Sequence, residues 1–470
     1  PSNDQSTNKK NTKNFHFNIE IAGNIINNSN YSKLSILPMY IDENWQLGYN
    51  INGFIALTDT AENLNNLTNL SNIFSSLLLN YQKNNQRFQF KVGQIKNLTF
   101  GHGMLIKKYT NTTNYPLNQD GGIVINYKSN SENFTFNLFS SSINELSKQG
   151  SLIGFQITTV LNFMKKLRLG SGLVYDINQF INTDEVWSGV DPKTRSILGY
   201  QFNLTYELKS ELLNDIYLFG EFVSLVYPKE LRYIRSISNN NQIVEEGFNR
   251  KNSFGILGPG IYWKLGHYRT FKIAFAYSSS LHMTSFFGET YNLERLHYIK
   301  SDALKAIEEN EPFSQDSEWN QMIKDNHIDK DSTAYYLPKD LYALINPTNN
   351  VNNKIGFSTT YNYKFRNYFE YTIDLTMLNE LGTVGDATQY YTIGLNLLIN
   401  DGLVKGISKI AIDFNQYFTS TPFNISNYNQ NTVLGLQLGI KLLKKLSLNI
   451  YRRDVFYDNN FNGKIDLNST

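Results

Sequence analysis

The feature that most restricts the fold of this chain is a two-residue alternation of large apolar and polar side chains. Between residues 198 and 208, Leu, Tyr and Phe alternate with Gly, Gln, Asn, Thr and Glu. Alternate side chains of a strand point to opposite faces, so such a segment predicts a strand with one apolar and one polar face. The same alternation recurs in segments 15–21, 88–92, 134–138, 271–277, 355–363, 369–377, 391–397 and 434–442.

Composition indicates which way these faces point. The chain contains 31 Tyr and 31 Phe, yet its mean hydropathy is only −0.38 and charged residues make up 18%. This mixture suits strands that show aromatic and aliphatic side chains to lipid and polar ones to a wet interior. No stretch approaches about 18 uninterrupted apolar residues, so a closed barrel is the way in which this chain could cross a bilayer.

The predicted connections alternate in length, as in barrels with short periplasmic turns and long extracellular loops. Short links fall at 42–44, 83–86, 130–132, 267–270, 366–368 and 444–445. Long links fall at 58–72, 96–120, 179–193, 230–252, 284–352 and 420–431. We therefore predict an all-β fold, a transmembrane antiparallel up-and-down β-barrel of about 18–20 strands with long extracellular loops.

The strand count raises a question about the C-terminal end. The pattern gives about nineteen strands, whereas single-chain bacterial barrels normally have an even number with both termini periplasmic. Either one segment is misassigned, or the chain stops before its closing strand, because residues 459–470 lack a terminal aromatic strand. At the other end no basic and apolar signal segment is present, so an exported chain would be a processed one.

These boundaries predict one domain. A polar N-terminal tail covers residues 1–13, the barrel covers 14–458, and a polar C-terminal segment covers 459–470. The longest loop, 284–352, is expected to contain short helices at 301–310 and 339–344, since it is too long for a bare connection. It is expected either to cap a pore or contact a partner, or to be a simple surface flap.

The most distinctive motif is Phe90-Lys91-Val92-Gly93-Gln94 followed by Leu98-Thr99-Phe100-Gly101-His102-Gly103, with Tyr109 and Asn111 a few residues on. Over about residues 87–127 the sequence resembles outer-membrane β-barrel (porin-like) proteins of spirochaetes and related bacteria. The resemblance implies an outer-membrane barrel with a transport or structural role, and it implies no catalytic residues.

The two glycines of this motif allow backbone angles that other residues avoid. We therefore expect Gly101, His102 and Gly103 to form a sharp bend that folds into the lumen as a constriction. A hydrogen-bonded structural role for His102 is favoured over a metal or catalytic role. Lys107 and Lys108 would add positive charge to the pore, with simple solvation on a loop as the alternative.

The alternation also predicts charged side chains that face the lumen. These are Glu207, Lys272, Lys364, Glu370 and Asp374. Both signs occur, so the pattern does not predict ion selectivity.

A calcium-loop spacing occurs near the C-terminal end. Oxygen-bearing side chains stand at alternate positions around Gly463, namely Asp458, Asn460, Asn462 and Asp466. Such oxygens can converge on Ca²⁺. The twelfth position is Ser469 rather than Glu, so the alternatives are a weak Ca²⁺ site, the only cofactor considered, and a polar turn.

Several function classes are disfavoured. The sequence has no Gly-x-Ser-x-Gly, His-Glu-x-x-His or phosphate-binding Gly-Lys-Ser/Thr motif, no cysteine, and only six widely spaced histidines, so we expect no enzyme. The net charge of +2 comes from dispersed residues, so we expect no nucleic-acid partner.

These observations favour a porin-like channel or transporter for small hydrophilic solutes in the bacterial outer membrane. The alternative is a plugged structural barrel that anchors a larger outer-membrane or cell-envelope assembly. A third reading, a soluble all-β protein that binds glycans, is disfavoured by the apolar columns. Expected partners are outer-membrane lipid with lipopolysaccharide or an equivalent glycolipid, and either envelope proteins or further copies of the chain.

Overall fold

The computed structural model describes most of the chain. The described ranges are 14–26, 29–56, 74–83, 85–111, 121–131, 133–161, 164–180, 195–208, 215–239, 242–289, 291–300, 328–330, 334–340, 352–381, 389–419, 432–443 and 446–456.

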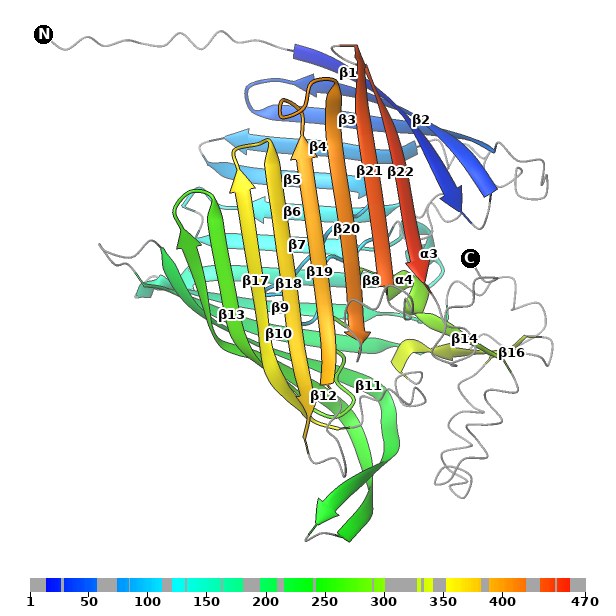
Figure 1. Cartoon of the computed structure of the whole chain (residues 1–470), viewed down its shortest axis with the longest axis vertical. Helices are drawn as coiled ribbons and strands as arrows, with labels where there is room; N and C mark the ends of the chain where they lie inside the picture. The colour runs from blue at the N-terminus through cyan, green and yellow to red at the C-terminus, as the bar shows by residue number, and fades with distance from the viewer. Residues whose placement is uncertain are drawn as a thin grey trace, which may run out of the picture.

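One sheet of nineteen strands forms the body of this described part, and strands consecutive along it pair antiparallel (Figure 1). Its first thirteen strands are β1 (Asn14–Ile26), β2 (Ser29–Ile41), β3 (Trp45–Ala56), β4 (Phe74–Lys83), β5 (Gln86–Gly93), β6 (Gly122–Lys128), β7 (Phe134–Ser140), β8 (Leu152–Leu161), β9 (Met164–Asp176), β10 (Ile197–Leu208), β11 (Ile216–Asn239), β12 (Gln242–Leu265) and β13 (Arg269–Ser278). The others are β17 (Lys354–Phe365), β18 (Phe369–Glu380), β19 (Gln389–Asn400), β20 (Ile407–Thr419), β21 (Thr432–Leu443) and β22 (Leu446–Phe456).

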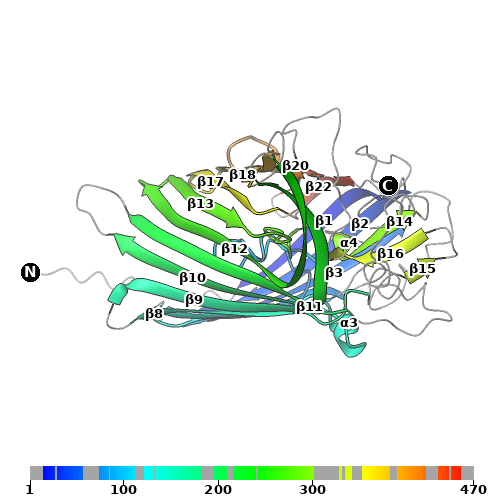
Figure 2. The same ribbon diagram turned by 90° about the horizontal axis from the view of Figure 1, so that it is seen from below.

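The two ends of the sheet meet. β1 pairs in parallel with β22 through three residue pairs, from Ile19 with Leu446 to Ile21 with Leu448. A parallel contact is expected here, because neighbouring strands alternate in direction and the described strand number is odd. The sheet curves into a flattened ring (Figure 2), which confirms the predicted up-and-down barrel.

The two faces of the sheet differ as the alternation predicts. On β10, Phe202 and Leu204 are 56% and 47% exposed. The side chain of Gln201, directly before Phe202, points to the opposite face and is fully buried. Other large apolar side chains exposed on the outer face are Phe222, Ile273, Phe275, Ile373, Ile412 and Leu436. An outside that is apolar over so many strands is a surface for lipid.

The longest strands differ from the prediction. Residues 230–252 were expected to be a loop, but β11 and β12 continue through them as a hairpin that projects beyond the barrel (Figure 1). Their pairing continues from Leu231 with Arg250 to Asn239 with Gln242. The prediction was wrong because backbone pairing between the two strands continues where the side-chain alternation fades.

The connection between β13 and β17 contains structure that the sequence did not predict. It includes α4 (Tyr291–Glu294) and a separate three-stranded sheet of β14 (Leu296–Lys300), β15 (Ile328–Lys330) and β16 (Ala334–Pro338). The helix predicted at 301–310 lies outside the described residues, and only the first two residues of the one at 339–344 are described.

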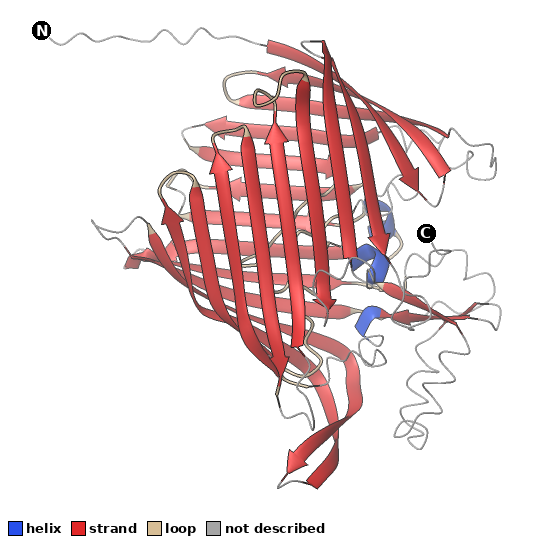
Figure 3. Cartoon of the chain, viewed as in Figure 1, coloured by secondary structure: helices blue, strands red, loops and turns tan. Residues whose placement is uncertain are grey.

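In the part of the chain that the structure describes, helices are few and short (Figure 3). After β7 comes α3 (Ile143–Ser147), whose first turn is capped by the Ser142 hydroxyl, which accepts a hydrogen bond from the Glu145 amide. Within the described ranges no helix is long and apolar enough to cross a membrane.

Candidate functional site

The interior of the barrel holds a plug made from two connections, residues 94–111 after β5 and the described residues 279–289 and 291–295 after β13. The ends of the first segment lie together, because the Asn111 amide donates to the Ile95 carbonyl at 3.3 Å. Its stem is closed by reciprocal backbone hydrogen bonds between Leu98 and Tyr109. The two segments are joined by hydrogen bonds from the Phe287 amide to the Leu105 carbonyl and from the Ser285 amide to the Met104 carbonyl.

The plug brings an apolar core into the lumen. Its fully buried members are Phe100, Leu105, Ile106, Tyr109, Phe286, Phe287 and Tyr291. They pack against inward residues of the wall; for example, the Phe100 and Phe139 rings meet edge to face at 5.6 Å. Burial of each such side chain contributes about 1.5–3 kcal/mol, so the plug is held firmly inside the barrel.

The Gly101 bend lies directly on the inner wall. Gly101 has φ +54°, and a Cβ atom there would be 2.7 Å from Glu221 Oε1 and 2.9 Å from side-chain nitrogens of Asn203 and Gln201. The next amide, of His102, donates to Glu221 Oε2 at 2.9 Å. Only glycine combines this backbone angle with so close an approach to β10 and β11.

Charged groups connect the plug to both sides of the barrel. Lys272 Nζ on β13 donates to the His102 carbonyl at 3.2 Å. On the other side, Lys107 and Lys108 place their ammonium groups 3.8 and 3.9 Å from the Asp374 carboxylate on β18. Lys108 also donates to Asn415 Oδ1 on β20 at 3.2 Å. The plug therefore reaches from the β10–β13 wall to the β18–β20 wall.

The structure thus gathers some of the candidate residues and separates others. Gly101, His102, Gly103, Lys107 and Lys108 lie in the plug, and Lys272 and Asp374 contact it. The other lumen candidates lie apart from it, nearer the short turns: Lys364 and Glu370 form an ion pair at 3.6 Å, and Glu207 lies near the end of β10.

The calcium candidates Asp458, Asn460, Asn462 and Asp466 lie outside the described residues. Among the residues that are described, no group of three or more His, Asp or Glu side chains is arranged to hold a metal ion.

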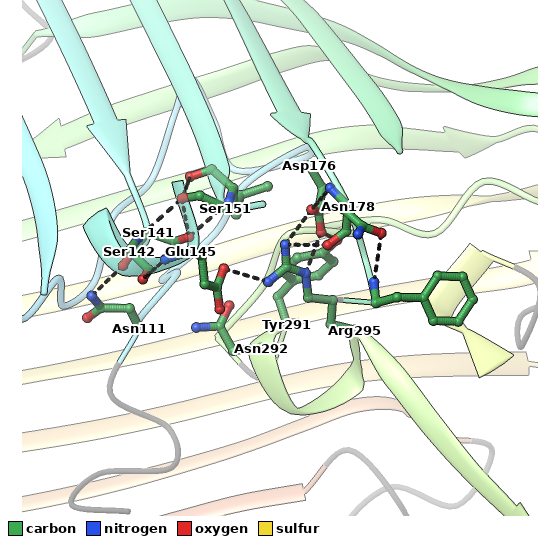
Figure 4. A network of polar contacts seen from close by, with 12 residues as sticks. Asn111, Ser141, Ser142, Glu145, Ser151, Asp176, Asn178, Tyr291, Asn292 and Arg295 are labelled. Carbon is green, nitrogen blue, oxygen red and sulfur yellow. Dashed lines mark hydrogen bonds and ion pairs between the residues drawn. The ribbon is translucent and has the colours of Figure 1, made fainter. Parts of the chain in front are cut away.

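Sequence reasoning missed a buried ionic network at the loop end of the barrel (Figure 4). Arg295, which follows α4, donates from Nε and Nη2 to the two oxygens of Asp176 at 2.7 and 2.5 Å, and from Nη1 to Glu145 at 2.8 Å. The Tyr291 hydroxyl also donates to Asp176 at 2.5 Å. This network fixes the second plug segment to β9 and α3.

A second buried pair lies nearby. Arg195 makes a bidentate contact with Asp340, in which Nε donates to Oδ1 at 3.0 Å and Nη2 donates to Oδ2 at 2.6 Å. The partners in both networks are separated by more than 110 residues, so no local motif could have revealed them.

The burial of His102 makes the stability of the folded protein depend on pH. Burial, followed by the charge of Lys272, lowers the pKa of His102 from 6.5 to about 3, against a weaker opposing hydrogen bond with the Leu204 backbone. The unfolded chain therefore takes up this proton near pH 6.5 and the folded one only near pH 3. The stability linked to neutral His102 is complete above pH 6.5 and is lost as the pH falls toward 3.

We accordingly expect His102→Gln to lose less stability than the wild type between pH 7 and pH 4. The measurement is the urea midpoint of unfolding in detergent, and His267→Gln, in the exposed turn before β13, is the control. Equal acid sensitivity of wild type and His102→Gln would contradict the prediction.

An antiparallel barrel that is apolar outside and encloses a plug has the architecture of the bacterial outer-membrane β-barrel proteins. No family model and no curated protein sequence matches the chain.

Solved structures with a similar arrangement include three outer-membrane proteins. Wzi of Escherichia coli, a carbohydrate-binding barrel involved in group 1 capsule assembly, has 8% identity and a TM-score of 0.35 over 86% of this chain and 78% of its own. OprB of Pseudomonas putida has 10% identity and a TM-score of 0.34 over 82% and 93%. The iron transporter FrpB of Neisseria meningitidis has 8% identity and a TM-score of 0.35 over 92% and 67%.

Proposed function

We propose that this protein is a restricted channel through which small hydrophilic solutes cross a bacterial outer membrane. The observation that carries the proposal is the contrast between the two sides of the plug. Its apolar core is fully buried, whereas Gly101 is exposed and His102, Lys107 and Lys108 are half-buried at its tip. The tip therefore borders a solvated part of the lumen.

The wall beyond the plug supports the same proposal. On β3, β4 and β5 the inward side chains Gln46, Asn80 and Gln89 are polar and half-buried. Polar groups that are neither covered by the plug nor turned to lipid are suited to a water-filled passage. At this strand number a barrel is wide enough to hold both a plug and a passage.

The direct test is single-channel conductance of the detergent-purified protein in a planar bilayer. We expect steady conductance, smaller than that of an unobstructed barrel of the same strand number. A sealed bilayer that contains correctly folded and inserted protein would overturn the channel proposal.

The second candidate is a structural barrel that anchors an envelope assembly. The buried Arg295 and Arg195 ion pairs favour it, because a plug fixed by buried charges is suited to permanent closure. A stoichiometric partner that co-purifies from native membranes, together with absent conductance, would support this candidate. We propose no catalytic activity for either candidate. We also propose, from the resemblance over residues 87–127, that the chain is related to outer-membrane barrels of spirochaetes and related bacteria.

A further inference from the structure

Amide side chains form a continuous row across the inner wall. Strand register places one Asn or Gln directly beside the next on six consecutive strands, β3 to β8. The members, which we call the amide belt, are Gln46, Asn80, Gln89, Asn126, Asn137 and Gln156. With strands about 4.8 Å apart, the belt runs for roughly 24 Å around the lumen.

Hydrogen bonds orient much of the belt in one direction. Asn126 donates to Gln89 at 2.7 Å, Gln89 donates to Asn80 at 2.9 Å, and Asn80 donates to Gln46 at 3.0 Å. Each side-chain amide has two N–H donors and two acceptor positions. This series of hydrogen bonds, the relay, uses one N–H donor and one acceptor position of Asn80 and of Gln89. Each of these two amides therefore retains one donor and one acceptor at the surface of the lumen.

The inward-facing residues on either side of the belt show that it lies at the edge of the plug. In the row toward the long loops, Val124 and Phe139 are buried, and Lys91 pairs with Val124. In the row toward the short turns, the exposed Arg87 pairs with the half-buried Lys128. The belt is therefore a strip of uncharged donors and acceptors that lies beside the apolar wall residues Val124 and Phe139 and between rows that contain cationic side chains. Five of its six members are half-buried, and Gln156 is buried.

We propose that the amide belt is a binding strip for neutral, hydroxyl-rich solutes, namely sugars and short linear oligosaccharides. This inference rests on the proposed channel function and specifies its substrate class. A hydroxyl group both donates and accepts, which matches the paired donor and acceptor that each relay amide retains. The length of the strip suits several sugar units in a row, and the six belt side chains themselves carry no charge.

The test compares the wild type with the triple variant Asn80→Ala, Gln89→Ala, Asn126→Ala. The probe is maltohexaose, a neutral linear glucose oligomer, added to single channels in a planar bilayer. We expect maltohexaose to block the wild-type current and the half-blocking concentration to rise at least about tenfold in the triple variant, because three hydrogen-bonding side chains are lost. The matched control is Asn362→Ala, Thr372→Ala, which removes a hydrogen-bonded polar pair from the β17–β18 wall.

Binding of maltohexaose is also measured by calorimetry in detergent, which separates the two proposals. Conductance without block, equal block in both variants, or stronger block by an oligogalacturonate of the same length would overturn the sugar strip and leave the channel standing. Binding that depends on the amide belt in a protein without conductance would overturn the channel and support the strip.

Discussion

Replacement of Arg295 by leucine is expected to lower the free energy of unfolding by about 3–5 kcal/mol. The reason is that the variant leaves the buried carboxylates of Asp176 and Glu145 without their shared cation. The second plug segment should then detach from β9 and α3, and the channel current should become larger and noisier. The measurements are the urea midpoint in detergent, followed by gel mobility of folded and unfolded barrel, and single-channel recording.

The control for this prediction is Lys264→Leu. Lys264 lies 3.7 Å from Asp215, and the two side chains are 42% and 58% exposed, so its loss should change stability by no more than about 1 kcal/mol. An Arg295 variant as stable as this control would show that the network does not hold the plug.

Excision of residues 99–108, most of the first plug segment, is expected to raise the conductance several-fold. Leu98 and Tyr109 exchange backbone hydrogen bonds, so residues 99–108 can be replaced by a two-residue Asn-Gly turn that keeps this stem. The variant removes Gly101, His102, Lys107 and Lys108 together with the buried Phe100, Leu105 and Ile106, and it ends the contact between the two walls. Single-channel recording checks it, after circular dichroism and heat-modifiable gel mobility have shown that the barrel is folded.

A double substitution in the exposed turn between β19 and β20, Leu403→Ser, Val404→Ser, serves as the control, since it leaves the lumen unchanged. A folded excision variant with wild-type conductance would mean that this segment does not limit the passage.

The strands of the barrel wall could be predicted because the alternation of apolar and polar residues is visible within each short segment of sequence. Over residues 369–377 of β18, polarity shows which face a side chain occupies, from Phe369 outward to Asp374 inward, whereas the buried Leu378 breaks this pattern. The hairpin at 230–252 escaped prediction because backbone pairing sustains it where alternation is weak.

The interior could be predicted only in part. The glycines of the Gly101–Gly103 bend carry a local backbone signal, which pointed to that loop. Arg295 and Asp176 are 119 residues apart, and neither stands in a pattern that implies the other. The amide belt likewise becomes visible only when strand register sets Asn80 beside Gln89 and Asn126.

The contact between the first plug segment and β20 has a consequence for the order of folding. Lys108 and Asn415 are separated by 307 positions along the chain, so this contact is of very long range in sequence. Closing so long a stretch of chain is slow, and the contact cannot form before β20 has joined the sheet. The first plug segment must therefore remain unattached to β20 while most of the barrel wall assembles. Its contact with β20 forms only when the barrel is nearly complete.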